Sequence, residues 1–459
     1  MNFDGIVASI TDDEFTTSFL KGQFACIEGE EKEHPDDIDE IAKIKEKIKT
    51  HLSQIPEKTK KVTEQKSQDT LYNIAYFAKT ISTMHPGWGQ KGFETEEFKA
   101  EIEKLYREQE QLPVKKRLTG DALLTEFFRI TAQTIQDNHL SITDIKGNYP
   151  FKNKQKTIDS WRPFKLNHPK GKVGKNSAYN PQQLIEEGWS VFSESFSKGG
   201  TEYPLIIAER EKNGKKTGIV AFSSCLAPHD SKKEWDSILQ CFKTLYPTWD
   251  KVIIDFRGNT GGDGFQTREL AETLYSGKVP YCLQSVKRKT KENQLREELS
   301  RPIPEQPLWD KKAHPFRGDD KKRIFVLTDK ETGSAAEAIV PMLKNHPKVQ
   351  FVGENTCGCC QYGGVRPVAL PCGGRINLGS IYREYEDGMI ECVGHKPDIR
   401  CEGMDAMQVA LAPLPHVYVS SKKNTSQEEI IQPKTESKTS IFPSWMKNPS
   451  WLWQGKKQK

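Results

Sequence analysis

A small hydroxyl residue, Ser334, stands between a candidate strand and a candidate helix in the segment Thr332 to Glu337. The run from Arg323 to Thr328 has the β-branched and aromatic composition of a buried strand, and Ala335 to Leu343 has that of a helix. A serine on such a turn exposes its Oγ, and the N–H groups of the first helical turn face any oxyanion that develops there. This pattern suits a nucleophile, although a plain helix N-cap fits it too.

A second segment that could take part in chemistry is the glycine-rich loop from Arg257 to Gly264, which follows a candidate buried strand from Val252 to Phe256. Four of the seven residues from 258 to 264 are glycines. Glycine tolerates positive φ and close approach, so such a loop can aim peptide N–H groups at a ligand. A phosphate-binding loop is disfavoured, because the lysine and hydroxyl that end a P-loop are missing and the dinucleotide spacing does not match. The loop is therefore a candidate second half of an oxyanion hole.

These two segments and three others, in order along the chain, resemble the tail-specific, or C-terminal processing, serine proteases. The motifs are Asp-x-Arg-Gly-Asn-x-Gly-Gly from Asp255, Thr-Asp-x-x-x-Gly-Ser-Ala-x-Glu from Thr328, Val-Gly-Glu-Asn-Thr-x-Gly from Val352, Glu-x-x-Gly-x-x-Pro-Asp-Ile from Glu391, and upstream helices with His85-Pro86 and Asp137-Asn138-His139. The match spans roughly residues 70 to 412. The resemblance implies an α/β fold with a crotonase-like ββα core and an N-terminal helical bundle.

The resemblance also implies a set of catalytic groups. Relatives with a PDZ domain use a Ser–Lys dyad whose lysine lies in a Thr-x-Gly-Lys-Gly segment, and here Cys359 holds that position. The tricorn-like branch instead uses a serine, a histidine from the N-terminal helical region and a later glutamate, which match Ser334, His139 and Glu391. The histidine would take the serine proton and return it to the leaving amine. The glutamate would orient the imidazole directly or through Asn138, where tricorn has a serine.

In this interpretation the oxyanion donors are the N–H of Ala335 and that of a loop glycine, with Gly258 and Gly261 as candidates. The enzyme would be an endopeptidase that forms an acyl-enzyme on Ser334, needs no cofactor or metal, and acts on extended polypeptides bound by strand addition. Hydrolysis would fall away as His139 protonates, near its ordinary pKa of about 6.5. The alternatives are a catalytically inactive binding protein on the same fold, as among retinoid-binding proteins of the retina, and a structural interaction protein.

The cysteines raise the question of a metal or redox site. Cys357, Cys359 and Cys360 form one dense group, followed by single cysteines at 372, 392 and 401. Structural zinc sites pair their ligands in two separated sets, so this spacing is poor for zinc. Packing thiols are the favoured interpretation, with a redox-sensitive pair beside the active site as the alternative.

Composition is consistent with an enzyme of this kind. The chain has 459 residues, of which 29% are charged, and a mean hydropathy of −0.70. No apolar run reaches the 18 or so residues that a membrane span requires, and the net charge of +5 is spread along the chain, so neither a membrane nor a nucleic acid is an expected partner.

No signal peptide is visible, and irregular cysteine spacing favours reduced thiols. A cytoplasmic location is expected, with a secreted effector or a trimmed exported protein as alternatives; homo-oligomerisation is left open.

The expected organisation has five parts. They are a charged helical N-terminal extension (1–69), a helical bundle that carries the catalytic histidine (70–140), a connecting β-rich segment without a PDZ domain (141–216), an α/β protease core with a charged, proline-bearing lid at 286–318 (217–412), and a disordered basic tail with tryptophans (413–459). Within the bundle, His85-Pro86 is expected to fix the geometry of a helix end. The amphipathic stripe from Ile38 to Leu52 is expected to pack rather than to recruit a partner.

Overall fold

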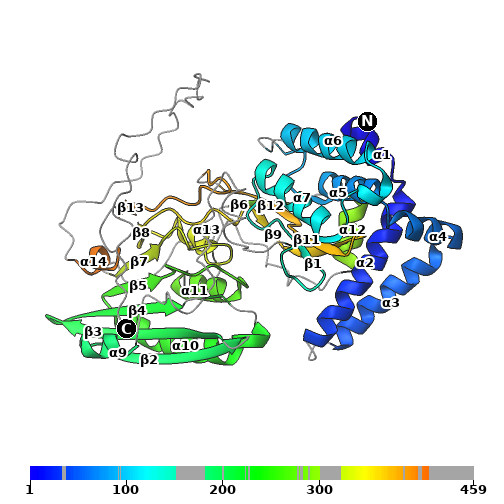
Figure 1. Cartoon of the computed structure of the whole chain (residues 1–459). Helices are drawn as coiled ribbons and strands as arrows, with labels where there is room; N and C mark the ends of the chain where they lie inside the picture. The colour runs from blue at the N-terminus through cyan, green and yellow to red at the C-terminus, as the bar shows by residue number, and fades with distance from the viewer. Residues whose placement is uncertain are drawn as a thin grey trace, which may run out of the picture. The chain divides into compact units, whose positions relative to one another are not determined.

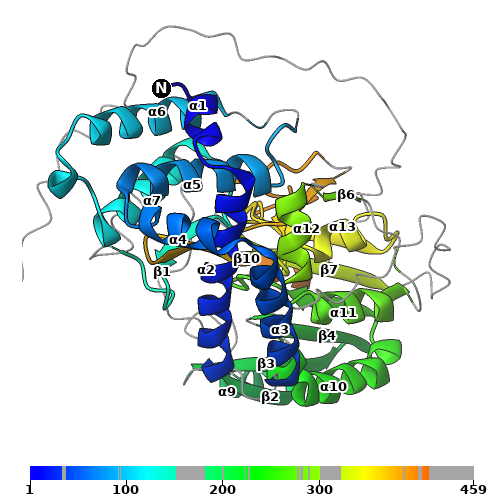
Figure 2. The same cartoon turned by 90° about the vertical axis from the view of Figure 1, so that its right-hand side faces the viewer.

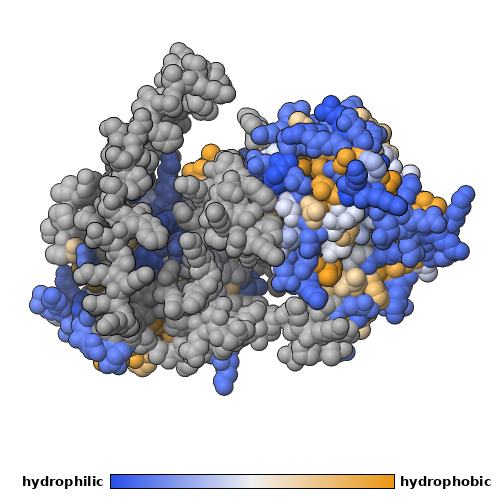
Figure 3. Space-filling view, viewed as in Figure 1, coloured by the Kyte–Doolittle hydropathy of each residue, from blue (hydrophilic) through white to orange (hydrophobic). Residues whose placement is uncertain are grey.

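The N-terminal region is helical, and its helices bury one continuous hydrophobic core. Its elements are α1 (Phe3–Ala8), α2 (Asp12–Glu33), α3 (Ile38–Gln54), α4 (Glu57–Lys66), α5 (Thr70–Met84), α6 (Glu96–Glu110), the 3-10 turn η2 (Val114–Lys116) and α7 (Gly120–Thr134). The stripe on α3 is buried at Ile41, Ile44 and Ile48, in the same core as α5 and α7. Figure 2 shows α3 alongside α2, and Figure 3 shows mainly hydrophilic residues over α6 and α4. Residues 1–69 therefore share a core with the predicted bundle.

The structure, a computed structural model, describes residues 1–33, 38–90, 93, 95–150, 181–198, 201–222, 224–225, 228–275, 279, 283–287, 290–299, 322–385, 388–401 and 406–412. The predicted tail at 413–459 lies outside these residues, as does the part of the predicted lid beyond Leu299. Within the described residues no helix combines the length and apolarity needed to cross a membrane.

A seven-stranded mixed sheet forms the second part of the fold. Its strands, in spatial order, are β13 (Ile399–Arg400), β8 (Val349–Gly353), β7 (Arg323–Thr328), β5 (Lys251–Asp255), β4 (Lys215–Phe222), β3 (Thr201–Lys212) and β2 (Ser190–Lys198). Neighbours from β13 to β4 are parallel, whereas β4, β3 and β2 form an antiparallel meander (Figure 1). The sheet therefore begins at Ser190, inside the segment predicted to be a connection.

Helices lie on both faces of this sheet, which explains why β5 and β7 are apolar almost throughout. Val252 and Ile254 of β5 belong to the core formed with α10 (Pro228–Leu245), α11 (Phe265–Tyr275) and α13 (Ile339–Leu343). Side chains alternate along a strand, so Lys251 points to the other face, where its Nζ donates to Ala410 O of α14 (Ala406–Leu411) over 2.8 Å. The predicted α/β class with an N-terminal helical region is confirmed.

Two small antiparallel sheets complete the described fold. One has the order β1 (Ser141–Asp144), β11 (Gly374–Leu378), β10 (Arg366–Leu370), and the other β6 (Leu283–Lys287), β12 (Ile381–Tyr385), β9 (Tyr362–Gly363). The remaining elements are α9 (Pro181–Glu186), the 3-10 turn η3 (Tyr246–Thr248) and α12 (Lys291–Glu298). Val368 and Ile376 lie in the core of the N-terminal helices. The chain thus returns from the large sheet to complete the helical region.

The first part of the predicted lid is ordered secondary structure. Residues 283–287 form β6, and α12 buries Asn293 and Arg296. Leu299, just after α12, is fully buried in the core of the N-terminal helices. This part of the segment is therefore packed, in contrast to the predicted surface lid.

Candidate active site

Ser334 stands on a strained turn that follows β7. Its φ is 51°, in the left-handed region that residues other than glycine rarely adopt. The helix expected from Ala335 begins only at Ile339, and residues 334 to 338 form turns instead. A sharp, strained turn between a strand and a helix presents a nucleophile's hydroxyl outward. The residue is half-buried.

His139 meets this serine from a distant part of the chain. Its Nε2 lies 2.9 Å from Ser334 Oγ, although 195 positions separate the two residues. The histidine lies in the turn between α7 and β1, and Leu140 beside it is buried in the helical core. Burial lowers the pKa of His139, which favours the neutral imidazole that can act as a base. The structure thus brings two of the three predicted catalytic residues into hydrogen-bond contact.

Glu391, the third predicted residue, lies close by but binds backbone. Its Oε1 accepts the N–H of Asn138 over 3.1 Å, and its Oε2 accepts the N–H of Gln361 over 3.0 Å. Ligand atoms of Asp137, His139 and Glu391 lie within 4.8 Å of one another. Burial, followed by the charge of Asp137, raises the pKa of Glu391 well above its usual value. Glu391 thus contacts the backbone beside His139, and within the described residues no hydrogen bond joins its carboxylate or Asn138 to the imidazole, whose Nδ1 is buried without a hydrogen-bond partner.

The two glycines named as oxyanion donors are already engaged, which corrects that prediction. The N–H of Gly258 donates to both carboxylate oxygens of Asp329 over 3.1 Å, and that of Gly261 donates to Asn259 Oδ1 over 2.9 Å. Side chains around the loop therefore satisfy these donors in place of a ligand. Among the described residues no acceptor takes the N–H of Ala335, which remains a candidate donor.

Gly261 matters for another reason: because it has no side chain, its loop can lie close to Ser334. Its φ is +97°, and a Cβ built on it would lie 2.7 Å from Ser334 Cβ and 2.8 Å from Ala335 N. Real Cβ atoms essentially never come so close. The glycine-rich loop therefore packs directly against the turn that carries the serine.

Glu337 is a residue whose role the sequence did not reveal. Its buried carboxylate accepts four hydrogen bonds, from the N–H groups of Ser334 (3.1 Å), Gly358 (2.7 Å) and Cys359 (2.7 Å) and from Thr356 Oγ1 (2.5 Å). It ties the nucleophile turn to the loop of residues 356 to 359. The available signal was the Ser-x-x-Glu spacing of a capping box, in which the glutamate accepts the backbone N–H of the serine.

The cysteine group lies beside the nucleophile without forming a thiol metal site. Among the described residues, the one cluster with spacing suited to a metal is Asp137, His139 and Glu391, and it contains no cysteine. Cys359 Sγ instead accepts the N–H of Ser334 over 3.0 Å. A side-chain hydrogen bond with Cys357, together with burial, raises the pKa of the Cys359 thiol well above its usual value. That thiol is therefore neutral near neutral pH.

Comparison with known proteins shows which family part of the chain resembles. Residues 216–401, which include the nucleophile turn and the glycine-rich loop, match the model of peptidase family S41. The chain carries a peptidase family S41 domain. The protein is a serine-type peptidase, and its predicted resemblance to the tail-specific proteases is confirmed. A search of curated proteins finds no match.

Solved structures similar to the protein include a putative peptidase from Parabacteroides merdae, with 14% identity over 75% of this chain and 97% of that chain, at a TM-score of 0.45. Mature CPAF has 13% identity, coverage of 73% of this chain and 93% of its own, and a TM-score of 0.46. The tricorn protease has 13% identity over 73% of this chain and 34% of its own, with a TM-score of 0.36.

Proposed function

We propose that the protein is an endopeptidase that cleaves polypeptides through an acyl-enzyme on Ser334, with His139 as general base. The observation that carries this proposal is the 2.9 Å contact between His139 Nε2 and Ser334 Oγ on a turn with positive φ. A base within hydrogen-bond reach of a hydroxyl is the geometry that proton removal requires.

The reaction follows from this pair. His139 Nε2 takes the hydroxyl proton as Ser334 Oγ attacks the peptide carbonyl, and the new C–O bond gives a tetrahedral oxyanion. The N–H of Ala335 would donate to that oxygen. The imidazolium then returns its proton to the leaving amine as the C–N bond breaks. Water, activated by the same imidazole, cleaves the ester and frees the serine.

Glu391 has a supporting role in this proposal. It accepts the N–H of Asn138 and, at the other oxygen, that of Gln361, so it fixes the backbone on one side of the histidine. The side chain of Gln136 donates to the backbone oxygen of Glu391 over 2.8 Å and strengthens the same junction. These contacts join the histidine turn to the loop that follows β12.

Intact-mass analysis after incubation with a fluorophosphonate tests the proposal on the wild type, Ser334→Ala and His139→Ala. A single adduct on the wild type alone supports an activated Ser334 that depends on His139. An adduct that persists on Ser334→Ala would place the nucleophile elsewhere. A wild type that stays unlabelled while folded would favour a binding protein on the same fold.

A further inference from the structure

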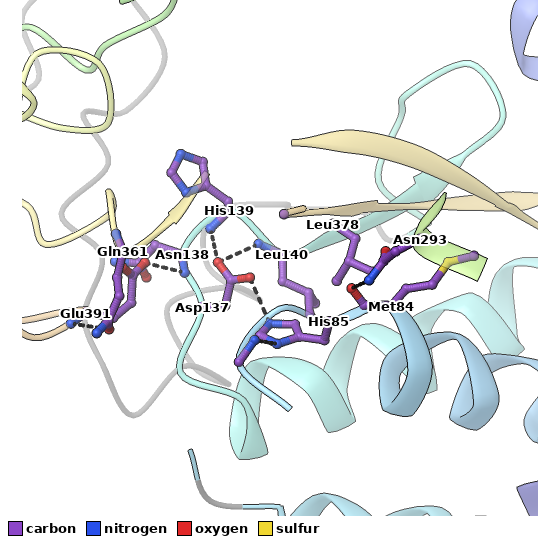
Figure 4. A network of polar contacts seen from close by, with 12 residues as sticks. Met84, His85, Asp137, Asn138, His139, Leu140, Asn293, Gln361, Leu378 and Glu391 are labelled. Atoms are coloured by element: carbon purple, nitrogen blue, oxygen red, sulfur yellow. Dashed lines mark hydrogen bonds and ion pairs between the residues drawn. The ribbon is translucent and has the colours of Figure 1, made fainter. Parts of the chain in front are cut away.

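A fully buried histidine and carboxylate lie directly behind His139. His85 and Asp137 both have 0% side-chain exposure, and His85 Nε2 lies 3.1 Å from Asp137 Oδ2 (Figure 4). His85 Nδ1 accepts the N–H of Gly87 over 3.0 Å. A neutral imidazole has one donor and one acceptor nitrogen, so Nε2 must carry the proton and donate it to Asp137.

The other oxygen of Asp137 holds the turn that carries the base. Asp137 Oδ1 accepts the N–H of His139 over 2.8 Å and the N–H of Leu140 over 3.3 Å. Three N–H donors thus converge on this carboxylate, which matches an ionised group that only accepts. A ligand oxygen of Asp137 also lies within 4.8 Å of a ring nitrogen of His139. The carboxylate is therefore close enough to act on the charge of the imidazole.

His85 is itself held in place by elements far away in sequence. It is the C-cap residue of α5, and its ring stacks on Phe93 at 4.6 Å and meets Tyr362 edge-on at 5.0 Å. Asn293 of α12 donates to Met84 O, at the end of the same helix, over 3.2 Å (Figure 4). The position of Asp137 thus depends on α5, α12 and β9 together.

The charged groups around His139 differ in effect. Burial lowers its pKa most, and the charge of Asp137 is the strongest influence in the opposite direction. Arg383 of β12 lowers the pKa further, and Glu337 raises it by less than Asp137 does. Both oxygens of Glu391 accept backbone N–H groups, those of Asn138 and Gln361, and burial beside Asp137 raises the pKa of Glu391.

We propose that Asp137, held by His85, is the carboxylate that stabilises protonated His139, whereas Glu391 acts through the backbone of Asn138. Asp137 is in this sense a positioning residue for the base. The inference rests on the proposed role of His139 as base, and it assigns the carboxylate function of the triad to a residue that precedes the histidine by two positions.

The test measures two properties in Asp137→Asn and Glu391→Gln: the pH midpoint of fluorophosphonate labelling, and the pH titration of the His139 imidazole by NMR in the full chain. Asparagine keeps an oxygen for the two backbone N–H groups but removes the charge. We expect Asp137→Asn to move both midpoints to lower pH and to slow labelling by at least about tenfold. Glu391→Gln should leave both midpoints unchanged.

A pair of variants at His85 separates position from charge. His85→Ala removes the donor to Asp137 and should slow labelling, whereas His85→Gln restores an N–H near the same place and should recover part of the rate. Equal rates for the two variants would mean that the hydrogen bond to Asp137 has no bearing on the base.

Two outcomes would overturn the inference. One is a downward shift of the pH midpoint of the His139 titration in Glu391→Gln that equals the shift in Asp137→Asn. The other is an unchanged His139 midpoint in a folded Asp137→Asn variant. If Asp137→Asn does not fold, the titration of Glu391→Gln still decides, because any marked downward shift assigns the charge to Glu391. Absence of labelling on the wild type would instead count against the proposed function, since the NMR titration reports the charge coupling without turnover.

Discussion

The backbone N–H of Ser334 donates to Cys359 Sγ, at the position where a Ser–Lys enzyme carries its general base. Here that position holds a neutral thiol that faces the backbone of the nucleophile. His139, the proposed base, contacts the hydroxyl from another part of the chain. Cys359 is accordingly part of the support of the turn and takes no proton from the serine.

Cys359→Ala should therefore retain activity. The N–H of Ser334 still has an acceptor in Glu337 Oε2, so fluorophosphonate labelling should stay within a few-fold of wild type. The lost thiol should lower the free energy of unfolding by about 1 kcal/mol, as measured in urea. Cys357→Ala is the matched control. A loss of labelling as complete as in His139→Ala would show that the thiol takes part in the chemistry.

Gly261→Ala should abolish labelling. The new methyl would collide with Gly333 O at 2.5 Å and with Ser334 Cβ, at a positive φ that alanine avoids. Gly264→Ala is the control, because no atom outside its chain neighbours lies within 4 Å of the added Cβ and no positive φ is involved. Labelling rates and far-UV circular dichroism of both variants test the contrast. Full activity in Gly261→Ala would contradict close packing of the loop on the nucleophile.

Ser334→Gly should be more stable than Ser334→Ala. Both variants lack the hydroxyl, so their difference isolates the backbone at φ 51°. Left-handed backbone costs a residue with a Cβ about 1 kcal/mol or more relative to glycine, so the glycine variant should unfold at higher denaturant by that amount. Equal stabilities would mean that the turn relaxes once the hydroxyl is gone.

Glu337→Gln should damage both stability and activity. An amide nitrogen cannot accept, so at least one of the four donors at this carboxylate loses its partner while buried, which costs about 1–3 kcal/mol. The displaced loop should also slow labelling of Ser334. Thr356→Ser keeps the hydroxyl that donates to this carboxylate and accepts the N–H of His395, and it serves as the conservative comparison. Chemical unfolding of the two variants would refute this account if Thr356→Ser were the more damaging.

The labelling rate should fall in acid at a midpoint below the ordinary histidine value of about 6.5. Burial lowers the pKa of His139, so the neutral, basic form persists to lower pH than it would in water. The sequence alone had suggested a fall near the ordinary value. Rates measured across the acid range, with folding verified at each pH, give the midpoint. A midpoint above the ordinary value would mean that the neighbouring carboxylates outweigh burial.

Ser334 stands in a local strand-to-turn pattern, whereas His139 was chosen because its Asp-x-His turn resembles a motif of the tail-specific proteases. The structure places these two side chains in contact. The oxyanion donors could not be predicted, because the fate of a backbone N–H depends on tertiary contacts. Gly258 donates to Asp329, which lies 71 positions away, and no spacing within the glycine-rich loop reveals that contact. The convergence of four donors on Glu337 is hidden for the same reason.

Secondary structure was predictable where the hydrophobic pattern is local. The buried stripe of α3 and the strands β5 and β7 follow from such patterns. The return of residues 366–378 to the helical core does not, since a short strand of alternating apolar residues can pack against either core. The packing of α12 against the end of α5 is equally non-local.

The nucleophile and the base belong to different hydrophobic cores: Leu140 beside the histidine is buried with the N-terminal helices, and Ala336 beside the serine is buried with the large sheet. Contact between the serine and the histidine therefore depends on how these two cores pack against each other. A mutation, a ligand or a partner that shifted one core against the other would separate His139 Nε2 from Ser334 Oγ and, in the proposed mechanism, stop hydrolysis. The contact between the two cores is therefore a place where a regulator of this peptidase would act.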